Sequence, residues 1–274
     1  QLAKSWEVKD GTVWTFHLRD DVTFHNGEPF DAEAAKFNLD MIIAPDSKSA
    51  WHSQLSSLIE KVEVIGPYTL QVTTFKPAPT LLVILAFQEM VAPKYYMEKG
   101  PEGFEAAPVG TGPFKFVSRD GSTVTLARNE NYWGGAPQIS ELVFKTIPEV
   151  SSRIAALKAG EIHIADRIPN DLTDELTGNV KPAVASGTRI YFLGMNVDQD
   201  PFKDPEVRRA VSKAIDRDLM VSALYKGQAR PLNQPAFPEM FGYQASIEGV
   251  TYDPEAAKAV LSSVTTPIRI DVRQ

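Results

Sequence analysis

The feature that most constrains the fold is a segment from Pro108 to Pro169 in which a turn, strands, an aromatic loop and a helix follow one another. It opens with Gly110 and Gly112 on either side of a threonine, and these glycines give the chain conformational freedom there. A proline then favours extended geometry. Phe114 and the next phenylalanine alternate with a lysine, as in a half-buried strand. The segment therefore begins as a turn that feeds a strand.

The rest of this segment predicts a loop and a helix. Residues 129–135, Asn-Glu-Asn-Tyr-Trp-Gly-Gly, form a polar loop whose two adjacent aromatic side chains are expected to pack against a core. A helix is predicted from Ser151, with Ile154 and Leu157 on one face. Gly160 is placed to end that helix.

Aspartates that precede apolar periodic runs predict further helices. Asp31 is the expected N-cap of one helix, and Asp204 and Asp253, each followed by proline, are the expected N-caps of two others. A fourth helix is expected from Asp218 to Lys226. The apolar faces expected for the first two helices are Ala34, Phe37, Met41 and Ile42, and Val207, Ala210, Val211, Ala214 and Ile215.

Several segments have the patterns of β-strands. Residues 13–18 alternate between apolar and polar side chains, and residues 62–64 and 69–74 flank a Gly-Pro turn. The apolar run of residues 81–87 is also expected to be a strand, and residues 162–164 resume a period of two. Strands and helices are mixed without strict alternation, which predicts an α/β or α+β fold.

Composition excludes several classes of protein. Hydrophobic residues make up 43% and charged residues 23% of the 274, values typical of a globular protein rather than a disordered one. The longest apolar run, residues 81–87, is too short to cross a bilayer. The net charge of −7, with no basic cluster, argues against nucleic acid as a partner.

Residue types also argue against catalytic and metal sites. Cysteine is absent, so disulfides, thiolate metal sites and cysteine nucleophiles are excluded. The histidines, His17, His25, His52 and His163, lack metal-binding spacing, and exposed or hydrogen-bonded roles fit them better. No nucleophile elbow, phosphate loop or dinucleotide fingerprint occurs. We therefore expect no catalytic residue, no metal site and no cofactor.

Together these motifs resemble the core signature of the family 5 extracellular solute-binding proteins, the peptide, nickel and opine receptors of ABC importers. The resemblance extends to residues 2–40, which include the sequence Phe-His-Asn-Gly, and to residues 196–220 and 252–261. It is weakest between Ala44 and Ala106.

The resemblance implies a mixed α/β fold, a lobe like that of type II periplasmic binding proteins with an inserted accessory domain. Residues 1–147 would form the accessory domain of the first lobe, residues 148–245 its central part, and residues 246–274 the start of the second lobe. Relative to the family pattern, the first strand and helix and nearly everything after Tyr252 are missing, so we expect an incomplete lobe pair.

The function implied by the resemblance is capture of a solute between two lobes and its delivery to ABC permease subunits in the inner membrane. The solute would be an oligopeptide, a dipeptide or a similar small molecule, and the receptor an exported periplasmic monomer whose signal peptide lies outside this chain. The alternative is a ligand-sensing domain of a cytoplasmic transcriptional regulator. Ligand identity stays open, because peptide, opine, sugar and nickel receptors would share these motifs.

Candidate ligand-binding residues lie in three places. One group sits where a strand is expected to approach the hinge, a second lies in a proline-rich loop, and a third follows the apolar run of residues 81–87. Core or loop packing is the competing interpretation for all of them, although aromatic and polar-tipped side chains on loops suit a pocket. The candidates are Tyr191, Met195 and Asn196, then Phe237 and Tyr243, then Gln88, Glu89 and Met90.

Overall fold

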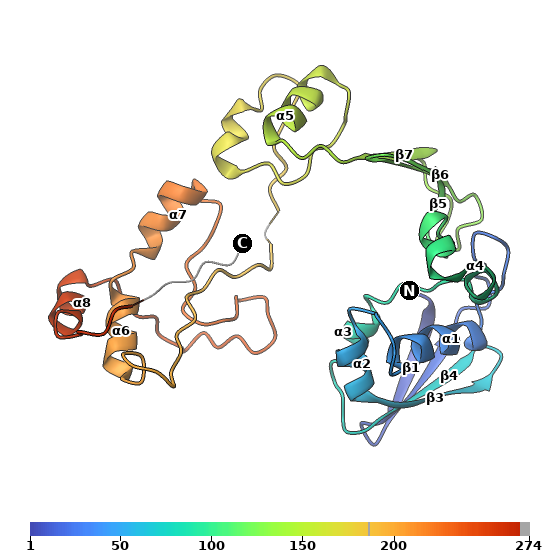
Figure 1. The fold of residues 1–274 in the computed structure, drawn as a ribbon, viewed down its shortest axis with the longest axis horizontal. Helices are drawn as coiled ribbons and strands as arrows, with labels where there is room; N and C mark the ends of the chain where they lie inside the picture. The colour runs from blue at the N-terminus through green and yellow to red at the C-terminus, as the bar shows by residue number, and fades with distance from the viewer. Residues whose placement is uncertain (186, 269–274) are drawn as a thin grey trace. The chain divides into compact units, whose positions relative to one another are not determined.

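The computed structural model describes residues 1–185 and 187–268, and the chain divides into two compact units (Figure 1). The first unit is Gln1–Ile147 and the second is Pro148–Gln274. The first unit combines antiparallel sheets with helices, and the second contributes helices and loops. The expected mixed α/β fold is therefore confirmed.

A four-stranded antiparallel sheet forms the base of the first unit. Its strands are β1 (Ala3–Lys9), β2 (Val13–Leu18), β3 (Ile59–Gly66) and β4 (Thr69–Thr74), in the order β1-β2-β4-β3. The alternation in β2 matches its structure, because every second side chain of that strand is buried. The strands predicted on either side of the Gly-Pro turn are also confirmed, and β3 begins earlier than expected.

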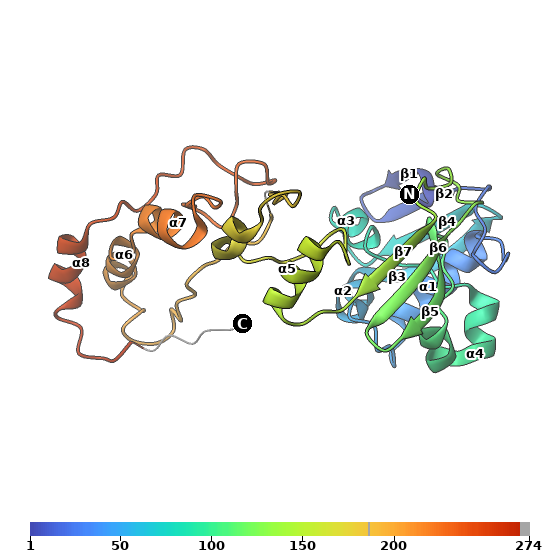
Figure 2. The ribbon, with the colours of Figure 1, turned by 90° about the horizontal axis from the view of Figure 1, so that it is seen from above.

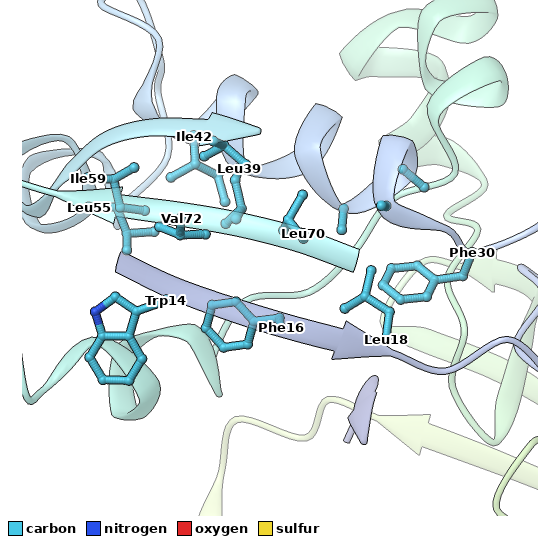
Figure 3. Packing of buried hydrophobic residues seen from close by; sticks show 14 of the residues in the cluster. Trp14, Phe16, Leu18, Phe30, Leu39, Ile42, Leu55, Ile59, Leu70 and Val72 are labelled. Atoms are coloured by element: carbon cyan, nitrogen blue, oxygen red, sulfur yellow. The ribbon is translucent and has the colours of Figure 1, made fainter. Parts of the chain in front are cut away.

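Helix α1 (Ala32–Ile43) packs against β3 and β4 and closes the hydrophobic core. Figure 3 shows Leu39 and Ile42 of this helix beside Val72 of β4. The predicted N-cap is confirmed, because the Oδ1 atom of Asp31 accepts a hydrogen bond from the Ala34 amide at 2.9 Å. The helix therefore starts where the sequence indicates.

The buried face of α1 differs from the expected one. Phe37 and Met41 are only half-buried, whereas Asn38 and Leu39 are buried. Phe37 instead makes an edge-to-face contact with Tyr96, at 6.2 Å between ring centroids. The hydrophobic pattern missed this rotation because Asn38, one of the buried residues of the face, is polar.

Asn38 joins α1 to the chain that enters helix α4 (Pro93–Ala106). Its side chain is 1% exposed. The Nδ2 atom donates to the carbonyl oxygens of Ala34 at 2.9 Å and Val91 at 3.0 Å, and Oδ1 accepts from the Val91 amide at 2.8 Å. Asn38 thus satisfies both the amide and the carbonyl group of Val91, which lies outside helices and strands.

The apolar run of residues 81–87 was expected to be a strand, and this prediction is wrong. It contains the short helix α3 (Leu81–Leu85), preceded in the chain by α2 (His52–Leu58). Leu81 is fully buried but Val83 is 62% exposed, so only one side of the run faces the core. A short apolar run does not by its periodicity distinguish helix from strand, which explains the error.

A second antiparallel sheet completes the first unit. Figure 2 shows its strands β5 (Phe114–Asp120), β6 (Thr123–Arg128) and β7 (Glu141–Lys145) side by side, in that order. The predicted strand at Phe114 is confirmed. All residues of these strands are half-buried or exposed, so neither face of this sheet is fully covered by the described residues.

The second unit contains helices α5 (Val150–Ala159), α6 (Pro205–Lys213), α7 (Arg217–Tyr225) and α8 (Pro254–Leu261), with the 3-10 helix η1 (Asn170–Glu175). Among residues 148–185 and 187–268 no strand forms. The predictions of a strand at residues 162–164 and of another before Asn196 are therefore wrong. A strand requires a partner that accepts its backbone hydrogen bonds, and the described residues supply none there.

The helix ends in the second unit follow the sequence closely. Asp204 accepts from the Glu206 amide at 2.8 Å and Asp253 from the Ala256 amide at 3.0 Å, which confirms both predicted N-caps. Helix α7 starts slightly earlier than predicted, because its cap is Asp216, which accepts from the Leu219 amide at 2.8 Å. Gly160 ends α5 with a φ of +75°.

The buried face of α6 is narrower than expected. Val207 and Ala210 are buried where α6 packs against α8, whose Ala257 is also buried. Val211 is only half-buried. The apolar stripe therefore covers a single helix contact and not a continuous core.

Replacing Asn38 with alanine should destabilise the first unit by about 2–3 kcal/mol, because the part-buried amide and carbonyl of Val91 would lose their partner. Asn131→Ala, at an exposed asparagine of the aromatic loop, is the matched control and should change the free energy of unfolding by less than about 0.5 kcal/mol. Urea unfolding followed by tryptophan fluorescence measures this directly, since all 4 tryptophans lie in the first unit. Equal effects of both variants would contradict the role given to Asn38.

Candidate functional site

Three segments of the first unit meet at the carbonyl oxygen of Gly112, which His25 and Asn129 both approach. We call this place the motif junction; it joins the FHNG turn (Phe24–Gly27), the GTG turn (Gly110–Gly112) and the aromatic loop (residues 129–135). The His25 Nε2 atom lies 2.9 Å from the Gly112 carbonyl oxygen, and the Gly110 amide donates to Nδ1 at 3.4 Å. The His25 amide also donates to the Gly110 carbonyl oxygen at 2.8 Å. The ring thus ties two motifs far apart in sequence.

The aromatic loop joins the junction through Asn129, which is 4% exposed. Its Nδ2 atom donates to the same Gly112 carbonyl oxygen at 3.1 Å. Its backbone amide donates to the Pro113 carbonyl oxygen at 2.8 Å, and its Oδ1 accepts from the Asn131 amide at 3.2 Å. One side chain therefore fixes both the start of the loop and the turn before β5.

Trp133 of the aromatic loop is half-buried and packs against the core, as predicted. The Arg19 guanidinium carbon lies 4.5 Å from the centre of its ring. Arg19 is oriented by Asp21, to which its Nε and Nη2 atoms donate at 2.9 and 2.7 Å. These hydrogen bonds hold the pKa of the Asp21 carboxyl below its usual range. Arg19 therefore presents a fixed cationic plane to the indole.

The FHNG turn also anchors helix α4. Glu28, the residue after the turn, accepts hydrogen bonds from the amides of Lys94 at 2.9 Å and Tyr95 at 3.0 Å. Asn26 donates to the same carboxylate at 2.6 Å. A carboxylate at the first turn of a helix satisfies free amides and is favoured by the helix dipole. His25 and Glu28 thus bind different elements from one turn.

Glycine has different roles in the two turns. Gly27 has a φ of +90°, which favours glycine over any other residue. Neither Gly110 nor Gly112 has a positive φ, so the expected conformational freedom of the GTG turn is not used for left-handed backbone. Gly112 contributes instead its carbonyl oxygen, which accepts from two side chains.

The remaining histidines show no site chemistry. The His52 Nδ1 atom lies 3.0 Å from the Ile42 carbonyl oxygen, His17 is partly exposed near Glu7, and His163 is exposed. Among the residues that the structure describes, no group of three or more histidine, aspartate or glutamate side chains could hold a metal ion. The motif junction is accordingly a structural centre, because its polar atoms bind one another and the backbone.

The candidate residues of the first unit follow helix α3. The Gln88 Nε2 atom donates to the Ile84 carbonyl oxygen at 3.0 Å, so the side-chain amide of Gln88 satisfies a carbonyl group in the last turn of α3. Glu89 is exposed and Met90 packs against the core. Of these three residues, only Glu89 presents its side chain freely to solvent.

The candidates before α6 lie in an open segment of the second unit. Tyr191 is 72% exposed, and its ring centroid lies 6.1 Å from that of Tyr225 in α7. Met195 is half-buried. Asn196 is exposed and closes a turn, since its Oδ1 accepts from the Asp198 amide at 3.1 Å.

The proline-rich loop holds the remaining two candidates. Phe237 lies under Arg230, whose guanidinium carbon is 5.4 Å from the ring centre, and Arg230 is paired with Glu239. Tyr243 is 36% exposed, whereas the neighbouring Phe241 is fully exposed. Within the described residues, no ring contact or hydrogen bond joins these two candidates to Tyr191.

The second unit also has an open hollow of about 1010 Å³ that the sequence analysis did not predict. Its wall is built mainly from residues 157–168 and 179–185. None of the eight candidate residues lines it. Apart from the end of helix α5 these segments are irregular, and the alternation at residues 162–164 predicted a strand and not a hollow.

No helix within the described ranges combines the length and the apolar character needed to cross a membrane.

The sequence pattern of the bacterial extracellular solute-binding proteins, family 5, matches residues 1–270. The chain is similar to the glutathione-binding protein GsiB of Pectobacterium atrosepticum, with 31% identity over 97% of this chain and 52% of that protein.

Solved structures agree with this similarity. NikZ from Campylobacter jejuni, in complex with Ni(L-His), matches with a TM-score of 0.81 and 30% identity, over 96% of this chain and 54% of that chain. The ABC transporter-associated periplasmic binding protein DppA from Helicobacter pylori, in complex with the peptide STSA, has a TM-score of 0.77 and 28% identity, over 96% of this chain and 56% of that chain. The chain therefore spans about half the length of the relatives it matches.

Gly27→Ala should destabilise the first unit by about 1–2 kcal/mol, because alanine would have to adopt a positive φ. An added Cβ at this position has open space within 4 Å, so backbone strain is the only expected cost. Gly112→Ala is the matched control, since it also has open space but no positive φ, and its stability should be unchanged or raised by up to about 1 kcal/mol. Urea melts that rank the two variants in the opposite order would disprove this assignment of the FHNG turn.

Proposed function

The chain belongs to the bacterial extracellular solute-binding proteins of family 5, and we propose that it is part of a receptor that captures a small solute for an ABC importer. The observation that carries this proposal is the family match over nearly the whole chain. The receptor would be exported to the periplasm, act as a monomer, use no cofactor and catalyse no reaction. The relatives described above are binding proteins, and they give no support to the alternative of a cytoplasmic transcriptional regulator.

We infer that the solute is a peptide or a similar small polar molecule. The names of the relatives point to glutathione, a nickel–histidine complex and a tetrapeptide, so the fold serves different ligands of modest size. The exposed aromatic and polar side chains at Tyr191, Asn196 and Tyr243 suit such a ligand, because aromatic faces cover apolar atoms while polar tips fix orientation. Oligopeptides and dipeptides are the specific members of this class that we propose.

The division of labour between the two units follows the proposal. Residues 1–147 would be the accessory domain, residues 148–245 the central part of the first lobe, and residues 246–274 the start of the second. The motif junction would hold the accessory domain together and leave ligand contacts to other residues. Its bonded polar atoms support this role.

The proposal is tested by isothermal calorimetry of the full-length protein with glutathione, a dipeptide, a tetrapeptide and nickel–histidine. One of these ligands should bind with a Kd of about 1 μM or lower, and the 274-residue chain alone should bind it at least about 100-fold more weakly, because closure between two lobes excludes water from the ligand. Equally tight binding by the isolated chain would contradict a cleft that needs both lobes. Failure of the full-length protein to bind any of the four would contradict the proposed solute class.

The same measurement tests the candidate site in the second unit. Tyr191→Ala in the full-length protein should weaken binding by about tenfold, since an exposed aromatic side chain would no longer cover the ligand. Tyr68→Ala, at a partly exposed tyrosine of the first unit, is the control and should change the Kd by less than about twofold. Equal effects of both variants would remove Tyr191 from the proposed site.

A further inference from the structure

We propose that His25 is a pH-sensitive latch, which in its neutral form holds the GTG turn against the FHNG turn and on protonation loosens that contact. The inference goes beyond solute binding, and it does not depend on the proposed function. It rests on the two hydrogen bonds of the imidazole ring and on the surroundings of that ring in the motif junction.

The two hydrogen bonds define one protonation state. The Gly112 carbonyl oxygen can only accept, so the His25 Nε2 atom, 2.9 Å away, must carry a proton. The Gly110 amide can only donate, so Nδ1, at 3.4 Å, must be free of a proton. The neutral Nε2–H tautomer is the one form of the side chain that satisfies both contacts.

Protonation changes only one of these contacts. A proton on Nδ1 would point at the Gly110 amide and replace a hydrogen bond with two opposed donors. The bond from Nε2 to Gly112 would remain, and so would the backbone bond from the His25 amide to the Gly110 carbonyl oxygen. The expected change is therefore a local loosening around Gly110 and not separation of the two turns.

The surroundings of His25 favour its neutral form. Burial is the largest influence and lowers the pKa of His25, the hydrogen bond to Gly112 opposes this, and the charge of Lys115 on β5 lowers the pKa further. The carboxylate of Glu28, the residue after the FHNG turn, is engaged by the amides of Lys94 and Tyr95 at the start of α4. The net direction of the pKa is downward.

A depressed pKa fixes the direction of the pH effect. Between the lowered folded pKa and the ordinary value of about 6.5, the unfolded chain binds more protons than the folded one. The latch therefore contributes its full stability above about pH 6.5 and loses it as the pH falls toward the folded pKa.

The first test is NMR of the chain with ¹⁵N-labelled histidine, which resolves tautomer and titration for each of the 4 histidines. His25 should be in the Nε2–H tautomer at about pH 7.5, with a midpoint below its ordinary value of about 6.5. The protection factor of the Gly110 amide against hydrogen exchange should fall by about tenfold as the ring titrates. An Nδ1–H tautomer, or a midpoint at or above the ordinary value, would overturn the proposal.

The second test uses His25→Gln, which keeps a side-chain N–H donor but does not titrate. The protection factor of Gly110 in this variant should not change between roughly pH 7.5 and pH 5. His17→Gln, at a partly exposed histidine of β2, is the matched control and should retain the wild-type pH dependence. If His25→Gln keeps the wild-type pH dependence, His25 is not the latch; if that variant does not fold, the tautomer and midpoint of the wild-type ring decide the question alone.

Discussion

The carbonyl oxygen of Gly112 is the acceptor that joins three sequence motifs of the first unit. It accepts hydrogen bonds from His25 and Asn129, side chains that belong to motifs separated by about a hundred residues. A carbonyl oxygen has two lone pairs, and this one uses both for side chains and none for regular secondary structure. The FHNG turn, the GTG turn and the aromatic loop therefore occur together in the sequence because they form one hydrogen-bonded structure.

Local signals in the sequence predicted local structure well. Asp31, Asp204 and Asp253 cap their helices, and Gly160 ends α5, because a cap needs only residues within one helical turn. The prediction of a strand for the apolar run that contains α3 was wrong, because periodicity over so few residues does not distinguish a helix from a strand. The contacts of His25 depend on residues far along the chain, and no local pattern could show them.

The candidate site was harder to predict than the fold. Strands expected in the second unit did not form among its described residues, because pairing requires a neighbour and capping does not. Tyr191 and Tyr243 are exposed, as a ligand-facing role would require, whereas Met90 is half-buried and packs against the core. Aromatic content alone did not separate these cases, since a large apolar side chain suits both a core and a pocket.

The placement of the tryptophans has an optical consequence. All 4 lie in the first unit, one of them buried in β2 and another stacked under Arg19, while the second unit has only tyrosine as a weaker fluorophore. Emission from the chain therefore reports the packing of the sheet and the aromatic loop. A solute that contacts only Tyr191 or Tyr243 would leave this emission nearly unchanged. Tryptophan fluorescence is therefore expected to stay constant when a ligand binds in the second unit alone.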